Sequence, residues 1–125
     1  HCDNAPCVTV CPTGASYKRA EDGIVLVNED ACIGCGLCAW ACPYGARYFD
    51  EERGVPDKCT WCYHRITKNL QPACVDACPT GARVFGNLLD RQSPISLFVR
   101  NKAGARLTAA AALPSAACAS PLSKA

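Results

Sequence analysis

Short apolar runs alternate with turn-forming residues over much of the chain. Ile24 to Val27 form one such run, directly after the turn-forming residues Glu21, Asp22 and Gly23. A strand-forming run that follows a turn in this way predicts a short β-hairpin. The pattern recurs over residues 46–57, where the turn falls between Asp50 and Gly54. The sequence therefore predicts two short hairpins.

Helical turns are expected next to these hairpins. Residues 37–41 and 73–77 each end directly before a Cys-Pro step. The residue before a proline disfavours the helical conformation, so these stretches suit single helical turns that stop there. Ser93 and Pro94 suit the cap and first residue of a further helix through residues 95–99. The predicted fold class is α+β, with short hairpins and short helices around cysteine loops.

Composition limits the size of the core. With 125 residues, the chain is at most one ordinary domain or two very small ones. Half of the residues are apolar, but that half includes all 12 cysteines. Large aliphatic residues are sparse, and small cores of this kind need disulfides or metals to hold them together. The cysteines are therefore the main candidates for chemistry.

Charge and hydropathy exclude two classes of function. The net charge is only +2 and no dense run of Lys or Arg is present, which argues against a nucleic-acid partner. No stretch reaches the roughly 20 apolar residues that a membrane-spanning helix needs. From residue 102 onward the chain is rich in alanine, with Cys118 standing alone. We interpret Cys118 as a small apolar residue or a free thiol, and not as a ligand.

The strongest pattern is a phrase, C-P-[TY]-G-A, that occurs three times and starts at Cys11, Cys42 and Cys78. Each copy closes a group of cysteines. The middle group has the full run C-x2-C-x2-C-x3-C-P, and the last is a variant with eleven residues between its second and third cysteines. The preceding cysteines are Cys2 and Cys7, then Cys32, Cys35 and Cys38, then Cys59, Cys62 and Cys74.

This spacing is typical of iron–sulfur ligation. In C-x2-C-x2-C three sulfurs converge on one cluster, and the fourth cysteine, before proline, ligates a neighbouring cluster. Gly34 and Gly36 fit, since glycine lets the backbone approach the inorganic sulfides and offer its N–H groups. Zinc sites usually use two separated C-x2-C pairs, and disulfide scaffolds have no reason to repeat this run. A structural zinc-binding interaction domain is the alternative from a different class.

Three segments carry a resemblance to a known family: HCDNAPCVTVCPTGASYKRAEDGIVLV, CIGCGLCAWACPYGARYFD and CTWCYHRITKNLQPACVDACPTGARVFG. They resemble the four-cluster ferredoxin-type electron-transfer subunit of molybdopterin oxidoreductases, such as dimethyl sulfoxide, polysulfide, thiosulfate and tetrathionate reductases. The resemblance implies a duplicated bacterial-ferredoxin-like fold. Its expected parts are a ferredoxin-like domain over residues 1–57 and half of a second over 58–92. The family's usual closing segment is not recognisable after them, and the composition of residues 93–125 predicts a helix with an alanine-rich, disorder-prone tail.

The family pairs its cysteine groups two by two, which implies the ligand sets. One complete 4Fe–4S cluster would take Cys11, Cys32, Cys35 and Cys38; a second would take Cys2, Cys7 and Cys42; a third Cys59, Cys62 and Cys74; and a fourth Cys78. The ligands still lacking are expected upstream of His1, in an N-terminally truncated chain. The intact protein would then hold up to four clusters. This chain would fully ligate one, and a three-cysteine site could hold a 3Fe–4S cluster.

The resemblance also implies function and partners. Because no nucleophile–base pair or phosphate-binding loop is recognisable, the chain is expected to be non-catalytic. The family relays single electrons between a membrane quinone or quinol subunit and a molybdopterin catalytic subunit in anaerobic respiration. Such partners would hold the chain at the cytoplasmic or the periplasmic face of the bacterial cytoplasmic membrane. A freely diffusing polyferredoxin is the alternative within the same chemistry.

Other residues near the motifs have weaker expectations. We expect the aromatic side chains to be apolar caps that keep water from the clusters, and His64 to be a loop residue and not a ligand. We expect the basic side chains to be solvated, although a positive charge near a cluster would raise its potential. The aromatic residues are Trp40, Tyr44, Tyr48 and Trp61, and the basic ones are Lys18, Arg47, Lys58, Arg65 and Arg83.

Overall fold

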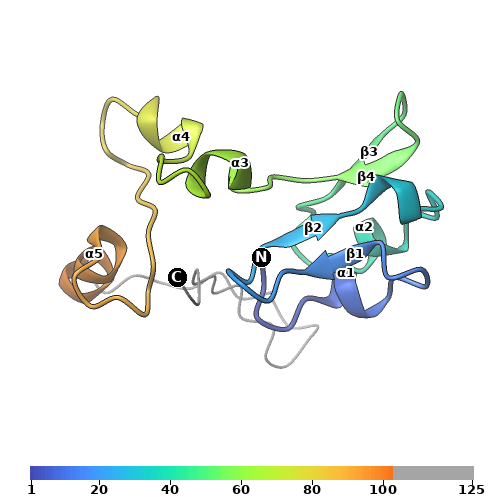
Figure 1. Cartoon of the computed structure of the whole chain (residues 1–125), viewed down its shortest axis with the longest axis horizontal. Coiled ribbons are helices and arrows are strands. Elements are labelled where there is room, and N and C mark those ends of the chain that lie inside the picture. Colours follow the sequence, from blue (N-terminus) through green and yellow to red (C-terminus); the bar gives the residue numbers. More distant parts are fainter. Residues whose placement is uncertain (103–125) are drawn as a thin grey trace.

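The computed structural model describes residues 1–102 of the chain. Its elements are α1 (Pro6–Thr9), β1 (Ser16–Lys18), β2 (Val25–Val27), the 3-10 helix η1 (Glu29–Ala31), α2 (Leu37–Trp40), β3 (Tyr48–Asp50), β4 (Val55–Asp57), α3 (Tyr63–Ile66), α4 (Ala73–Asp76) and α5 (Pro94–Lys102). Figure 1 shows α1, α2 and all four strands gathered in one part of the molecule. The segments that carry α3, α4 and α5 extend away from this part. The predicted α+β class is confirmed.

Both predicted hairpins are present. Strand β1 pairs antiparallel with β2, with Tyr17 opposite Leu26, and β3 pairs antiparallel with β4, with Phe49 opposite Pro56. The second turn closes through a hydrogen bond from the Gly54 N–H to the Asp50 carbonyl oxygen, at 2.8 Å. Gly54 has φ +68°, a left-handed conformation that glycine adopts without steric cost. Two of the three C-P-[TY]-G-A phrases thus lead into a hairpin.

The predicted helical turns are also present. Helices α2 and α4 stop just before their Cys-Pro steps, as the proline requires. Helix α5 begins at Pro94, and the Ser93 hydroxyl accepts a hydrogen bond from the Ser96 N–H at 3.3 Å. Ser93 therefore caps the helix as predicted. Residues 103–125, which include Cys118 and the alanine-rich tail, lie outside the described residues.

The core is small. Ile24 and Val25 are the largest fully buried side chains, and the buried apolar set also includes Cys2 and Cys38. Helix α1 packs against α2 and β1. With so few large apolar side chains, we expect folding to depend strongly on what the cysteines bind. None of the helices within residues 1–102 has the length and apolarity needed to cross a membrane.

Candidate iron–sulfur centre

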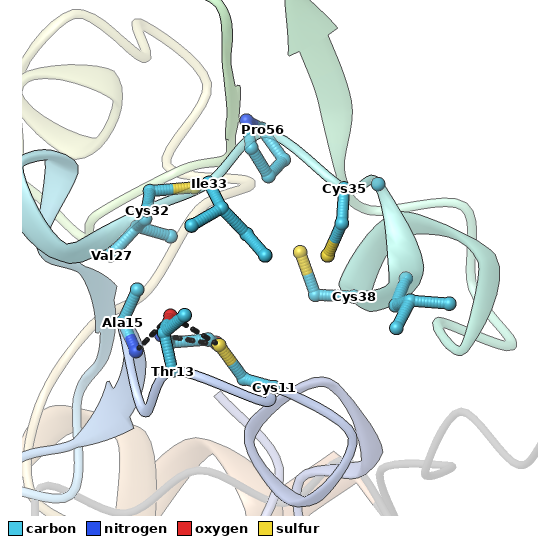
Figure 2. Close-up of a pocket in the computed structure, with 12 residues that line it drawn as sticks. Cys11, Thr13, Ala15, Val27, Cys32, Ile33, Cys35, Cys38 and Pro56 are labelled. Atoms are coloured by element: carbon cyan, nitrogen blue, oxygen red, sulfur yellow. Dashed lines mark hydrogen bonds between the residues drawn. The ribbon is translucent and has the colours of Figure 1, made fainter.

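Four cysteines from separate segments line one pocket. Cys11 lies in the loop after α1, Cys32 follows η1, Cys35 precedes α2, and Cys38 lies within α2. Figure 2 shows Cys32 on one side of this space, Cys35 and Cys38 on the other, and Cys11 below. The apolar walls of the pocket are Val27, Ile33, Leu37 and Pro56. The structure thus brings together the four cysteines that were expected to hold one complete cluster.

Backbone N–H groups point at the sulfur atoms of this pocket. The Ser16 N–H donates to the Cys11 sulfur at 3.3 Å, and the Gly34 N–H donates to the Cys32 sulfur at 3.5 Å. Such donors stabilise a thiolate and tune any metal that it binds. Burial acts to raise the pKa of the Cys11 thiol, but the hydrogen bonds from Ser16 and Thr13 outweigh it and lower the pKa. The lowered pKa favours the thiolate form of Cys11, which is the form that binds a metal.

Cys38 is the buried member of the set. Burial raises the pKa of its thiol, and the positive charge of Arg47 offsets part of that rise. An Arg47 terminal nitrogen, Nη1, donates to the Cys38 sulfur at 3.6 Å. A buried thiolate at this position therefore has a cation beside it.

Two of the three cysteines in the second expected ligand set, Cys2 and Cys7, lie at the small core. Cys2 is buried with Ala5 and Val25, and Cys7 packs against them. Tyr44, two residues after Cys42, packs against the same cluster. The Ala46 N–H donates to the Cys42 sulfur at 3.4 Å. Like the contact from Ser16 to Cys11 in the first copy of the phrase, it is a hydrogen bond from a backbone N–H to a cysteine sulfur.

The third cysteine group repeats the loop of the first pocket. The Trp61 N–H donates to the Cys59 sulfur at 3.4 Å, as the Gly34 N–H does to Cys32. Trp61 has φ +57° and Gly34 has φ +68°. A bulky residue in this left-handed region is strained, and such strain concentrates at functional sites. The C-x2-C loop keeps one conformation even where tryptophan replaces glycine.

Ion pairing connects the segments that carry Cys62 and Cys74. Arg65 of α3 pairs with Asp76 of α4 and donates to the Gln71 carbonyl oxygen at 2.8 Å.

The Thr80 hydroxyl lies 3.5 Å from the Cys78 sulfur, and hydrogen bonding from Thr80 and nearby N–H groups lowers the pKa of that thiol to about 7. Thr13 lies in the same relation to Cys11, at 3.7 Å. The two copies of the phrase that contain threonine therefore place the same hydroxyl group beside their cysteine sulfur.

The donor set fits a polynuclear cluster. Within residues 1–102, no group of three or more His, Cys, Asp or Glu side chains is arranged around a single ion position. The four cysteines lie instead around a pocket. In a 4Fe–4S cube each thiolate binds a different iron, so its four ligands need not meet at one point.

Arg47 corrects one expectation from the sequence. It was expected to be solvated, but it is only 6% exposed. Its side chain donates to the Ser16 hydroxyl oxygen at 2.6 Å and to the Cys7 sulfur at 3.3 Å. The sequence did contain a signal, since Arg47 directly follows C-P-Y-G-A, the position that Ser16 holds in the first copy. Lys58 is half-buried as well, and burial lowers its pKa to about 8.

The aromatic residues near the motifs differ in exposure and packing. Trp40 is 91% exposed and does not cover the pocket, contrary to the expected cap. Tyr44 packs on the small core, and the Trp61 ring lies 5.4 Å from that of Phe85 in an edge-on contact. His64 is exposed and lies in helix α3, and not in a loop as expected.

Comparison with known proteins agrees with this donor set. Residues 1–88 match the family described as the 4Fe-4S dicluster domain. The chain is therefore an iron–sulfur protein. It belongs to the 4Fe-4S dicluster domain family. Membership of this family confirms the predicted 4Fe–4S cofactor and disfavours the zinc alternative.

Several curated proteins are similar over most of the chain. One subunit of the sulfite dehydrogenase of Allochromatium vinosum is 51% identical over 86% of the chain, and one component of the polysulfide reductase of Wolinella succinogenes is 51% identical over 81%. Thiosulfate reductase electron transfer subunit PhsB of Salmonella typhi is 55% identical over 82%. The matched parts cover 47%, 53% and 52% of these relatives, so the chain spans about half their length.

Proposed function

We propose that this chain is part of a non-catalytic iron–sulfur subunit that relays single electrons. The observation that carries the proposal is the gathering of Cys11, Cys32, Cys35 and Cys38 around one pocket. Four thiolates would occupy all four irons of a cube and leave no coordination position for a substrate. A cluster held in this way supplies one-electron transfer.

The chain's own residues would tune this electron transfer. The N–H groups of Ser16 and Gly34 stabilise negative charge on the ligand sulfurs. Val27, Leu37 and Pro56 line the site with apolar surface. Hydrogen bonding, charge and exposure are the quantities that set the potential of such a cluster.

We further propose that the other cysteines ligate neighbouring clusters in a duplicated ferredoxin-like arrangement, with one domain over 1–57 and half of a second over 58–92. The repeated N–H contacts to Cys32, Cys42 and Cys59 support this assignment. Each remaining set has fewer than four cysteines: each three-cysteine set needs one further ligand or holds a 3Fe–4S cluster, and the site of Cys78 needs three further ligands. The sets are Cys2, Cys7 and Cys42; then Cys59, Cys62 and Cys74; then Cys78.

The proposed partners are a molybdopterin catalytic subunit and a membrane subunit that exchanges electrons with quinone. The names of the relatives support a multisubunit setting, because each is one component of a dehydrogenase or of a reductase. Their substrates differ although their similarity to this chain is equally high. We therefore infer that the substrate is chosen by the partner.

Affinity isolation of the full-length protein from its own cells, without oxygen, tests this proposal. We expect a molybdenum-containing subunit to copurify, and the reduced clusters to be reoxidised in the isolated complex when the substrate of that subunit is added. Recovery of the protein alone, with fully reducible clusters, would instead support a freely diffusing polyferredoxin. Recovery with zinc and without iron would reject both.

A further inference from the structure

We propose that Arg47 is shared by two neighbouring cluster sites and raises the reduction potentials of both. The proposal rests on the ligand sets of the proposed function. Arg47 lies directly before β3, and its two terminal nitrogens reach different sulfur atoms. Nη1 lies 3.6 Å from the Cys38 sulfur, and Nη2 lies 3.3 Å from the Cys7 sulfur. Cys38 belongs to the complete four-cysteine set, and Cys7 belongs to the second set.

Burial makes this contact more than a surface charge. Arg47 is 6% exposed, and none of the ion pairs formed within residues 1–102 includes it. A buried cation is costly unless an opposite charge lies beside it. Cluster thiolates at Cys7 and Cys38 would supply that opposite charge from two sides.

The third nitrogen of the guanidinium points to the same ligand. The Arg47 Nε atom is buried and has no hydrogen-bond acceptor among the described residues. Buried N–H groups in proteins nearly always have an acceptor. The sulfides and thiolates of a bound cluster would provide one, so the unpartnered Nε is independent evidence for an anionic group that the side chains alone do not supply.

Ser16 explains why one arginine serves two sites. Ser16 and Arg47 occupy the same position in successive copies of the C-P-[TY]-G-A phrase, one residue after its alanine. The buried Ser16 hydroxyl accepts a hydrogen bond from Arg47 Nη2 at 2.6 Å, which orients the guanidinium. An arginine at both positions would bring two like charges together in a buried space. Serine in one copy and arginine in the other leave one guanidinium, and not two, in contact with the sulfurs of the two sites, with the Lys58 ammonium as a further positive charge near Arg47 and Cys7.

The electrostatic consequence follows from the charge of the cluster. Reduction adds an electron, so a positive charge nearby stabilises the reduced state more than the oxidised state. Removing that charge should lower the potential of each cluster that it contacts. If Arg47 had only a structural role, its substitution would lower the cluster content of the protein. It would not shift the reduction potentials of two clusters in the same direction.

Redox titration of the full-length protein, followed by electron paramagnetic resonance, tests the proposal. In Arg47→Gln we expect the ratio of reduced to oxidised cluster at a fixed potential to fall about tenfold for two clusters, which is ~59 mV for a one-electron couple. Arg47→Lys keeps the charge and should recover much of both shifts. Arg100→Gln removes a charge from α5, which Figure 1 shows well away from β1 and α2, and should change neither potential.

Each outcome decides the proposal. Unchanged potentials in Arg47→Gln with intact clusters would overturn it, and a shift confined to one cluster would overturn the sharing. If the glutamine variant assembles no clusters, Arg47→Lys decides. A single ammonium cannot contact both sulfurs as the two Arg47 nitrogens do, so the ratio of reduced to oxidised cluster must still fall for both clusters, by less than tenfold, and unchanged ratios would overturn the proposal. Absence of clusters from the unsubstituted protein would instead overturn the proposed function.

Discussion

Gly34 faces the backbone of Gly54 so closely that a β-carbon on Gly34 would lie 2.7 Å from the Gly54 carbonyl oxygen. Gly34 stands between the ligand candidates Cys32 and Cys35, and Gly54 closes the turn between β3 and β4. The second hairpin therefore lies directly against the cysteine loop, and Pro56 of β4 lines the same pocket. Glycine is needed at position 34 for this close approach and also for its left-handed backbone, with φ +68°.

We expect Gly34→Ala to reduce cluster content and thermal stability. The left-handed backbone alone costs about 1–2 kcal/mol for alanine, and the contact with the Gly54 carbonyl adds to that cost because backbone cannot move aside easily. Gly14→Ala is the matched control, since Gly14 has φ +69° but nothing lies within 4 Å of its added β-carbon. Iron content and thermal melting of both variants measure the difference. Equal losses would show that the Gly34–Gly54 contact is unimportant.

Cys35→Ser should remove or degrade one cluster. Serine replaces the thiolate of an exposed ligand in the four-cysteine pocket while keeping nearly the same shape. We expect iron and acid-labile sulfide per chain to fall by up to the content of one cluster. Cys118→Ser is the control and should leave both values unchanged, because Cys118 stands outside every motif. A loss of iron with the Cys118 substitution would mean that the ligand assignment is wrong.

Arg53→Gln should lower the melting temperature slightly, and less so at high salt. Arg53 pairs with Asp50, Asp57 and Glu29, and so connects the second hairpin to the 3-10 helix before Cys32. These pairs are solvent-exposed, so their contribution is small and is screened by ions. Melting curves at low and high salt provide the measurement. A melting difference of the same size at both salt concentrations would argue against an electrostatic role.

Removal of the clusters should unfold residues 1–57. Within residues 1–102, Ile24 and Val25 are the largest fully buried side chains, and two cysteines are themselves part of the buried set. When a metal centre supplies most of the long-range connections, its binding free energy becomes folding free energy. Oxidative removal of iron followed by circular dichroism should show loss of the hairpin signal. Retention of that signal would show that the apolar core is sufficient.

The local elements were predictable because their signals are local. The turn at Gly54, the stop of α2 before Cys-Pro, and the Ser93 cap each depend on a few adjacent residues. The four-cysteine set was implied by a family resemblance, and the structure brings those residues to one pocket without showing ligation. The burial of Arg47 was missed because it depends on contacts with Cys7 and Ser16, residues distant in sequence, and its place directly after the repeated phrase was the only local signal.

The central claim is that Cys11, Cys32, Cys35 and Cys38 hold a 4Fe–4S cluster that transfers one electron. The most direct measurement is electron paramagnetic resonance of the anaerobically purified chain before and after dithionite, combined with assays of iron, sulfide and zinc. We predict a reducible 4Fe–4S signal with matching iron and sulfide, and its loss in Cys35→Ser. A colourless preparation that contains zinc and no sulfide, and that gives no paramagnetic signal on reduction, would contradict the account.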